Sequence, residues 1–302
     1  MTAWRWLAWC VVLAVSTTVS HAGYEIEEQR LGPLPESILD AGFSRDGLHV
    51  IWVVEQGAKQ LVAVDGVPGP EYDGVGQGSL VFSADGTRVA YAVKQGAKWW
   101  VVVDGVPGPE YDGIREGNLV FSADGTRVAY AAGQGAKWLV VVDGLPGPEC
   151  DGLGEGPVFS ADGARLAYAA QQGAKQLVVV DGVPGPEYDG IAGSPVFSAD
   201  GARVAYGAQQ DAKWLVVVDG VSGPEYDDIG EGSLVFSADG TRVAYGAQQG
   251  AKWLVVVDGV PGPEYDGLIP NGPTFHQEGI LEYLAGRDGV LFRVQHVPTP
   301  AQ

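Results

Sequence analysis

Apolar and polar positions along this chain repeat with a period of 38 or 39 residues. The repeated unit opens with a phenylalanine, and its copies start at Phe43, Phe82, Phe121, Phe159, Phe197, Phe236 and, in a more divergent form, Phe275. A fixed period of about 20–50 residues is typical of solenoids and propellers, in which each repeat is one small group of secondary-structure elements. The repeat therefore predicts seven structural units of one kind.

Each unit predicts four short strands separated by strong turn signals, as the second copy shows. Asp85-Gly86 is a tight-turn signal, because glycine accepts the positive φ that hairpin turns require. Gln95-Gly96 marks the next turn, and residues 105–109, rich in glycine and proline, mark the third. The predicted strands of this copy are 80–83, 88–93, 98–104 and 110–112.

The third strand shows how the units must pack. Its sequence WWVVV, Trp99 to Val103, is apolar on both faces, so it must be covered from two sides. Neighbouring units supply that cover in a propeller, whose blades are four-stranded sheets. We therefore predict an all-β fold, a seven-bladed β-propeller of four-stranded antiparallel blades.

The two ends of the repeated region predict how the ring closes. The seventh unit, 273–298, offers three strands and lacks the fourth, while residues 24–31 form an isolated strand ahead of the first unit. Pairing the two would complete the last blade with the N-terminal strand and remove an open sheet edge. An open solenoid is the alternative, and the split terminal unit argues against it.

Composition supports this fold class and excludes some partners. The chain has 46 glycines, 19 prolines and one methionine, a composition that favours turns and strands. Its formal net charge of −20 argues against nucleic acid, since phosphate binding needs clustered Lys and Arg. Anionic membrane surfaces are equally poor partners.

The N-terminus reads as a secretory signal peptide. Arg5 precedes an apolar run from Trp6 to Val15, and small polar residues follow up to Ala22. The run is half of what a membrane-spanning helix needs, so no stable membrane insertion is expected after cleavage. We assign 1–22 to the signal peptide, 23–297 to the propeller and 298–302 to a short tail, and expect a periplasmic or extracellular protein. Because Cys10 lies in the signal, only Cys150 remains and no internal disulfide can form.

The segment after each leading phenylalanine resembles the WD40-like repeat called PD40, found in the propellers of TolB-type periplasmic proteins. The copies read FSADGTRVAY at 82–91 and 121–130, FSADGARLAY at 159–168 and FSADGARVAY at 197–206, with alanine where the family pattern has proline. The resemblance implies the propeller fold and says little of function. TolB-like proteins carry an additional α/β domain, and 302 residues leave no room for it here.

The sequence offers no pattern typical of catalysis. A catalytic site gathers different groups at one place, whereas identical copies distribute the same groups around a ring. His49, His276 and His296 lie in the irregular first and last units and in no metal-ligand motif. The recurring aspartates, such as Asp85 and Asp104, could bind calcium, but Asp before Gly is ordinary turn chemistry. We predict a protein that is not an enzyme and has no cofactor or metal.

A repeated Lys-Trp pair suggests one alternative function. The third strands open with GAKW or GAKQ, which places Lys98 and Trp99, for example, at equivalent positions in most copies. Such tryptophans could pack between blades or could stack on sugars, giving several weak sites whose avidity multiplies. A multivalent lectin that binds glycans is therefore the alternative hypothesis.

The copies differ most in two sets of loops, and these predict a partner-binding face. One set joins the second and third strands, and the other links successive blades; in an up-and-down blade both emerge on one face of the disc. Loops on a rigid scaffold carry recognition, and neutral drift would give the same pattern. We predict a monomer that binds a protein or peptide through this face. The candidate residues are Gln56, Gln95, Arg115, Glu116, Gln134, Glu155, Gln172, Gln210, Glu231 and Gln249.

Overall fold

The computed structural model shows seven antiparallel sheets, one for each repeated unit. The second blade consists of β7 (Gly74–Val75), β8 (Val81–Phe82), β9 (Val89–Gln95), β10 (Lys98–Val103) and β11 (Val106–Pro107). One short 3-10 turn, Gln277–Gly279, is the only helical element in the part of the chain that is described. The structure describes residues 16–21, 24–32, 35, 37–269 and 272–298.

Each blade has four strand positions, and β7 and β8 are two halves of the first. Both halves pair with β9, through Gly74–Lys94 and Val81–Ala90. In the fifth blade the same path is one strand, β22 (Gly190–Phe197), with a register shift in its middle. The fourth strand likewise extends beyond β11, because an isolated bridge pairs Trp99 with Tyr111.

The other blades repeat this plan. The first blade comprises β3 (Ile38–Phe43), β4 (Val50–Gln56), β5 (Lys59–Val64) and β6 (Val67–Tyr72). The third comprises β12 (Gly113–Ile114), β13 (Val120–Phe121), β14 (Val128–Gln134), β15 (Lys137–Val142) and β16 (Leu145–Pro146). The fourth comprises β17 (Gly152–Leu153), β18 (Val158–Phe159), β19 (Leu166–Gln172), β20 (Lys175–Val180) and β21 (Val183–Pro184).

In the fifth blade, β23 (Val204–Gln210), β24 (Lys213–Val218) and β25 (Val221–Tyr226) follow β22. The sixth comprises β26 (Asp228–Ile229), β27 (Val235–Phe236), β28 (Val243–Gln249), β29 (Lys252–Val257) and β30 (Val260–Pro261). The last comprises β31 (Gly267–Leu268), β32 (Thr274–Phe275), β33 (Leu281–Arg287) and β34 (Val290–His296); within the described residues it lacks the fourth strand position, as predicted.

The turn before each fourth strand is shorter than predicted. Asp104 and Gly105 both have positive φ, 51° and 79°, which is the two-residue hairpin turn of type I′. The fourth strand therefore begins at Val106, whereas the sequence predicts a turn over 105–109. Its prolines are tolerated because this strand is at the edge of the sheet.

The hydrophobic core lies between blades. Val128, Tyr130 and Val141 of the third blade are buried against Ala90 and Val101 of the second. Val140, the neighbour of Val141 in the same strand, belongs to the next core, shared with the fourth blade. The predicted burial of the third strand on both faces is confirmed in the inner blades, and β34 of the last blade has no buried residue. Each fully buried Val contributes about 1.5–3 kcal/mol.

In every blade after the first, the second strand also sends a tyrosine across to the preceding blade. The Tyr130 ring meets the ring of Tyr111 edge-on, with centroids 6.3 Å apart. Its hydroxyl lies against Gly108 of the preceding fourth strand, where an added Cβ would be 3.5 Å from that oxygen and 3.2 Å from the Val101 carbonyl oxygen. Glycine is thus needed at this position because two blades approach closely there.

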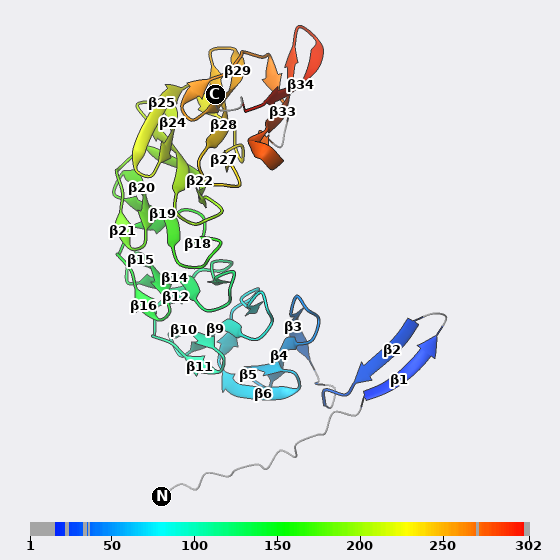
Figure 1. Ribbon diagram of the computed structural model, residues 1–302. Coiled ribbons are helices and arrows are strands. Elements are labelled where there is room, and N and C mark those ends of the chain that lie inside the picture. Colours follow the sequence, from blue (N-terminus) through cyan, green and yellow to red (C-terminus); the bar gives the residue numbers. More distant parts are fainter. Residues whose placement is uncertain (1–15, 22–23, 33–34, 36, 270–271, 299–302) are drawn as a thin grey trace, which may run out of the picture.

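The blades follow one another along an open arc (Figure 1). First strands such as β18, β22 and β27 lie on its concave side, and fourth strands such as β11, β16 and β21 lie on its convex side. No helix among the described residues is long and apolar enough to cross a membrane. The predicted fold class is confirmed, since the chain is all β and builds seven propeller-type blades.

Closure of the last blade by the N-terminal strand is not confirmed. The predicted strand is present as β2 (Tyr24–Gln29), but it pairs with β1 (Ser16–His21) instead of with the last sheet. A local hairpin closes a far shorter loop than a pairing across the whole chain, so it costs less conformational entropy. Most of the predicted signal peptide, 1–15 and 22, and residues 299–302 of the predicted tail lie outside the described residues.

Candidate binding face

The turns between second and third strands lie on the same face as the links between blades. Lys98 Nζ pairs with Asp112 Oδ1 at 2.7 Å, and Asp112 Oδ2 accepts a 2.7 Å hydrogen bond from the Gly135 backbone N–H. Asp112 opens the link after the second blade, and Gly135 lies in the turn of the third. We call this surface the link face. Its turns between second and third strands are 56–59, 95–98, 134–137, 172–175, 210–213 and 249–252. Its links between blades are 73–80, 112–119, 151–157, 189–195 and 227–234.

This arrangement ties the recurrent lysines to link aspartates at the surface. The hydrogen bond from Gly135, and next the one from Lys98, lower the pKa of Asp112, so the carboxylate stays charged in both contacts. The lectin hypothesis relies on these lysines, and the structure engages them in ion pairs with the link aspartates. The equivalent pairs are Lys59–Asp73, Lys137–Asp151, Lys175–Asp189, Lys213–Asp227 and Lys252–Asp266.

The structure brings the predicted partner-binding residues together on the link face. The glutamines end the second strands and are exposed, namely Gln56, Gln95, Gln134, Gln172, Gln210 and Gln249. Glu116, Glu155 and Glu231 are exposed in the links, whereas Arg115 is half-buried. Their placement follows from the antiparallel connectivity of each blade, and their role in binding stays a prediction.

Two of these residues are engaged within the fold. Arg115 Nη1 donates hydrogen bonds to the carbonyl oxygens of Leu153 and Gly154 in the next link, both at 2.8 Å. Glu155 accepts a 2.7 Å hydrogen bond from Ser194 Oγ in the link after that. Arg115 therefore joins one link to the next through its Nη1.

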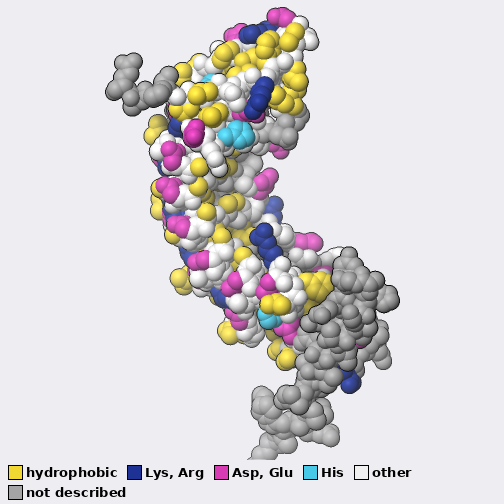
Figure 2. All heavy atoms as spheres, turned by 45° about the vertical axis from the view of Figure 1, so that its right-hand side comes forward, with side chains coloured by type: hydrophobic (Ala, Val, Ile, Leu, Met, Phe, Trp, Pro, Cys, Tyr) yellow, Lys and Arg dark blue, Asp and Glu magenta, His cyan; other side chains and the backbone are white. Residues whose placement is uncertain are grey.

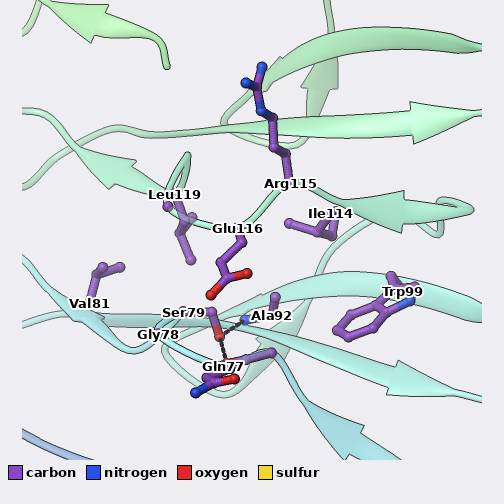
Figure 3. Close-up of a pocket in the computed structure, with 12 residues that line it drawn as sticks. Gln77, Gly78, Ser79, Val81, Ala92, Trp99, Ile114, Arg115, Glu116 and Leu119 are labelled. Atoms are coloured by element: carbon purple, nitrogen blue, oxygen red, sulfur yellow. Dashed lines mark hydrogen bonds between the residues drawn. The ribbon is translucent and has the colours of Figure 1, made fainter. Parts of the chain in front are cut away.

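A groove of about 400 Å³ opens on the link face between the second and third blades. Figure 3 shows Gln77 and Glu116 in this groove, on the links that form its two walls, and Arg115 pointing away from it. Ser79 holds one wall in place, because its Oγ accepts a hydrogen bond from Ala92 N at 3.1 Å and donates one to the Gly76 carbonyl at 2.7 Å.

Trp99 forms one end of the groove and is half-buried, with Lys94 Nζ 5.8 Å from the ring centroid. The first and fourth blades have glutamine at this position. There Gln60 accepts a 2.7 Å hydrogen bond from Val75 N, and Gln176 accepts one of 2.8 Å from the following blade. The amide thus bridges two blades in those copies, whereas the indole at Trp99 lines an open groove.

The groove can bind a ligand that has both an apolar body and polar groups. Val81 and Leu119 give it an apolar wall, and Gln77 and Glu116 make no hydrogen bond to another described residue. An amide and a carboxylate are thus free to meet a partner. Sequence reasoning selected Glu116 and missed Gln77, although Gln77 occupies the position that holds Glu116, Glu155 and Glu231 in other copies.

Several other ionisable groups have hydrogen-bond partners within the fold. Asp85 accepts hydrogen bonds from Ser83 and Thr87 within its turn, which lower its pKa. His49 Nδ1 lies 2.7 Å from Asp65 Oδ2, and in the last blade His296 lies near a tyrosine hydroxyl. Within the described ranges no three His, Cys, Asp or Glu side chains gather closely enough to hold a metal ion.

No family model and no curated protein matches this sequence. Similar solved structures include TolB from Acinetobacter baumannii, at 16% identity over 72% of this chain, with a TM-score of 0.34; this chain spans 64% of that TolB chain. A eukaryotic initiation factor is 13% identical over 90% of this chain and 80% of its own, with a TM-score of 0.45. The β-propeller domain of the Trilobed protease from Pyrococcus furiosus is 12% identical over 86% and 94%, with a TM-score of 0.38. The seven repeated sheets themselves fit the PD40 type of propeller that the sequence resembles.

Proposed function

We propose that this protein is an exported, non-enzymatic scaffold that binds a protein or peptide partner through the link face. The groove between the second and third blades is the centre of the proposed site. The observation that carries the proposal is the contrast between Gln77 and Glu116, which face open space, and the recurrent Lys98 and Asp112, which satisfy one another. Free polar groups beside an apolar wall are what a recognition surface needs.

A charge reversal in the groove tests this proposal. Immobilised wild-type protein, Glu116→Lys and Glu110→Lys are each exposed to an envelope extract, and captured proteins are identified by mass spectrometry. Glu110 is an exposed glutamate near the end of the second blade's fourth strand, so its variant carries the same charge change outside the groove. A partner retained by wild type and by Glu110→Lys but lost by Glu116→Lys supports the proposal. A partner that Glu116→Lys retains, or that both variants lose, contradicts it.

Glycan binding is the second candidate, and the position of Trp99 favours it. An indole at the end of a groove lined by an amide and a carboxylate can stack on a sugar ring while the polar groups bind its hydroxyls. Trp138, Trp214 and Trp253 are half-buried at the same position in other blades, which would give several sites per chain. Glycan-array binding with a stoichiometry above one, which falls in Trp99→Ala while the sites at the other tryptophans remain, would select this function over the first.

Export is part of the proposal and is supported by Arg5 and the apolar run that follows it. Expression of the full chain followed by cell fractionation and N-terminal sequencing tests this point. The mature protein should be recovered outside the cytoplasm and begin near Gly23. Recovery of the uncleaved chain in the cytoplasm would contradict it.

A further inference from the structure

One position of the links shows how the fold itself places an arginine on the link face. Arg115 is the fourth residue of the link 112–119, and its Nη1 donates hydrogen bonds of 2.8 Å to the carbonyl oxygens of Leu153 and Gly154 in the next link. This side chain therefore crosses from the third blade to the fourth. The fourth residues of the other links, which have no side chain long enough for this crossing, are Gly76, Gly154, Ala192 and Gly230.

The groove between the second and third blades lies at the equivalent place one blade earlier. Gly76 lines it at the position of Arg115, while Ile114 and Arg115 line it at the positions of Leu153 and Gly154. Among the described residues, no side chain donates a hydrogen bond to the carbonyl oxygens of Ile114 and Arg115. The groove of about 400 Å³ is thus the space that an arginine crosses in the following pair of blades, and residue 76 leaves it open.

The charge of the groove suits a guanidinium group. Glu116 lies in it and makes no hydrogen bond with another described residue, whereas Arg115, the one basic residue of its lining, points away (Figure 3). The whole chain has 38 acidic and 18 basic residues, and acidic side chains recur along the arc (Figure 2). A cationic segment is therefore attracted to this protein and meets a carboxylate in the groove that no described residue engages.

The walls of the groove suit the stem of an arginine side chain. Val81 and Leu119 supply apolar surface, and long basic side chains lay their methylene groups along such surface while the charged end stays in polar surroundings. The indole of Trp99 already has Lys94 Nζ 5.8 Å from its ring centroid, so an entering cation is directed to the carboxylate of the groove. Arginine fits better than lysine, because its planar fork carries several N–H donors in fixed directions, enough for a carboxylate and two carbonyl oxygens together.

We propose that the groove binds an arginine side chain of a protein partner, in the way that Arg115 binds the next link. The guanidinium donates to the carbonyl oxygens of Ile114 and Arg115, and the carboxylate of Glu116 balances its charge. The stem of the arginine lies along Val81 and Leu119. This inference rests on the proposed function, because it names the side chain that the link face recognises in its partner.

NMR titration of the full chain with three short peptides tests the proposal. The peptides are Gly-Gly-Arg-Gly-Gly and its variants with citrulline or lysine in place of the arginine, all blocked at both ends. Citrulline has the shape of arginine without the charge, so the arginine peptide should bind about tenfold more tightly than the citrulline peptide, with the lysine peptide between them. Equal binding of the arginine and citrulline peptides, or no binding of the arginine peptide, would overturn the proposal.

Two further proteins locate the binding in the groove. Glu116→Gln keeps the shape of the side chain and removes its charge, so it should weaken the arginine peptide about tenfold, whereas the matched control Glu110→Gln should not. Gly76→Arg combined with Ser79→Asn copies the residues of the next link, so the chain's own arginine should fill the groove and abolish binding. Circular dichroism establishes that all variants keep their strands. Binding retained by the filled protein, or equal effects of the two glutamate substitutions, would contradict the proposal.

The outcomes separate this inference from the proposed function. A partner captured from the envelope extract in a Glu116-dependent way, together with an arginine peptide that does not bind, would overturn the arginine site alone and leave the link-face site in place. A sugar that shifts the NMR resonances of groove residues such as Trp99, where the arginine peptide shifts none, would overturn it in favour of glycan binding. Displacement of the captured partner by the arginine peptide but not by the citrulline peptide would support it.

Discussion

The guanidinium carbon of Arg88 lies 5.3 Å from the centre of the Phe121 ring, although the two residues belong to successive blades. The same side chain donates from Nε to Asp104 of its own blade at 2.8 Å. Its Nη1 donates to the carbonyl oxygens of Gly125 and Thr126 in the next blade, at 2.9 and 2.8 Å. One arginine thus joins two blades through an ion pair, two hydrogen bonds and a cation–π contact.

We call each contact between successive blades a seam. Removing the arginine at one seam should lower the stability of the whole array. Arg127 makes the equivalent contacts with Asp143 and Phe159. We expect Arg127→Met to lower the free energy of unfolding by about 1–3 kcal/mol, the range for hydrogen bonds of a charged group together with a cation–π contact. Urea unfolding followed by tryptophan fluorescence measures the change.

The control for this experiment is Arg45→Met. Arg45 is exposed in a turn of the first blade and has no ion pair or ring contact with a described residue. Its replacement should change stability by less than about 0.5 kcal/mol, as is usual for surface substitutions. Equal effects of the two substitutions would show that the seam contacts add nothing to stability.

Most of the strand order was predictable from the sequence, but these seams were not. Turn signals such as Asp85-Gly86 recur in each unit, so they predict the strands without any knowledge of packing. The sequence predicts Arg88 only as a residue of its own strand. It does not predict the contact with Phe121, which lies 33 residues further on and belongs to another unit. The available signal was that an arginine follows the leading phenylalanine by six residues in every copy except the first and last.

The candidate site was predictable in position but not in shape. Antiparallel connectivity alone puts the link and the turn of the next blade on one face, as the Asp112–Gly135 contact shows. Whether a groove opens there depends on side-chain volume and direction at Trp99 and Glu116, which the sequence does not specify. The two hydrogen bonds of Arg115 could not be predicted, because their acceptors are backbone carbonyl oxygens, which every residue carries; its role in binding stays a prediction.

Cys150 replaces a tyrosine and leaves a small cavity. Five copies place a tyrosine here, and the pair Tyr188–Tyr206 meets edge-on with centroids 6.3 Å apart. At Cys150 a cavity of about 50 Å³ remains beside Tyr168. Burial raises the pKa of the Cys150 thiol, so it is a poor nucleophile.

Restoring the tyrosine should stabilise the protein. We expect Cys150→Tyr to raise the free energy of unfolding by about 0.5–2 kcal/mol, the usual gain from filling a cavity. The matched reverse change, Tyr188→Cys, should lower it by about 2–5 kcal/mol, because it creates a cavity. Thermal and urea unfolding of both variants measure these effects. A destabilised Cys150→Tyr would mean that the fourth blade has closed around the smaller side chain.

Two equivalent tyrosines differ in whether the hydroxyl has a partner, and this difference predicts opposite effects. The Tyr130 hydroxyl is buried without a hydrogen-bond partner among the described residues, whereas the Tyr283 hydroxyl lies 3.2 Å from His296 Nε2. Tyr130→Phe should raise the free energy of unfolding by about 1 kcal/mol, because an unsatisfied buried polar group is costly. Tyr283→Phe should lower it by about 1 kcal/mol. Urea midpoints that shift in the same direction in both variants would contradict this account.

The first blade contains the ion pair whose contribution to stability should depend on pH near neutrality. His49 occupies the position of the seam arginines, and its Nδ1 lies 2.7 Å from Asp65 Oδ2, with 39% of its side chain exposed. This hydrogen bond, with the charge of Asp65, raises the pKa of His49. A raised pKa means that the contribution to stability is complete below the ordinary pKa of about 6.5 and is lost as the pH rises through the folded-state value.

The substitutions His49→Arg and His49→Gln measure this dependence. Arginine stays charged, so the stability of His49→Arg relative to wild type should increase as the pH is raised from about 6 to about 8. Glutamine is never charged, so His49→Gln should be least stable relative to wild type at low pH and approach it at high pH. His296, whose pKa burial lowers, contributes with the opposite sign but equally in all three proteins, so the differences isolate His49. Urea midpoints that keep a constant separation across this range would show that the His49–Asp65 pair does not contribute to folding.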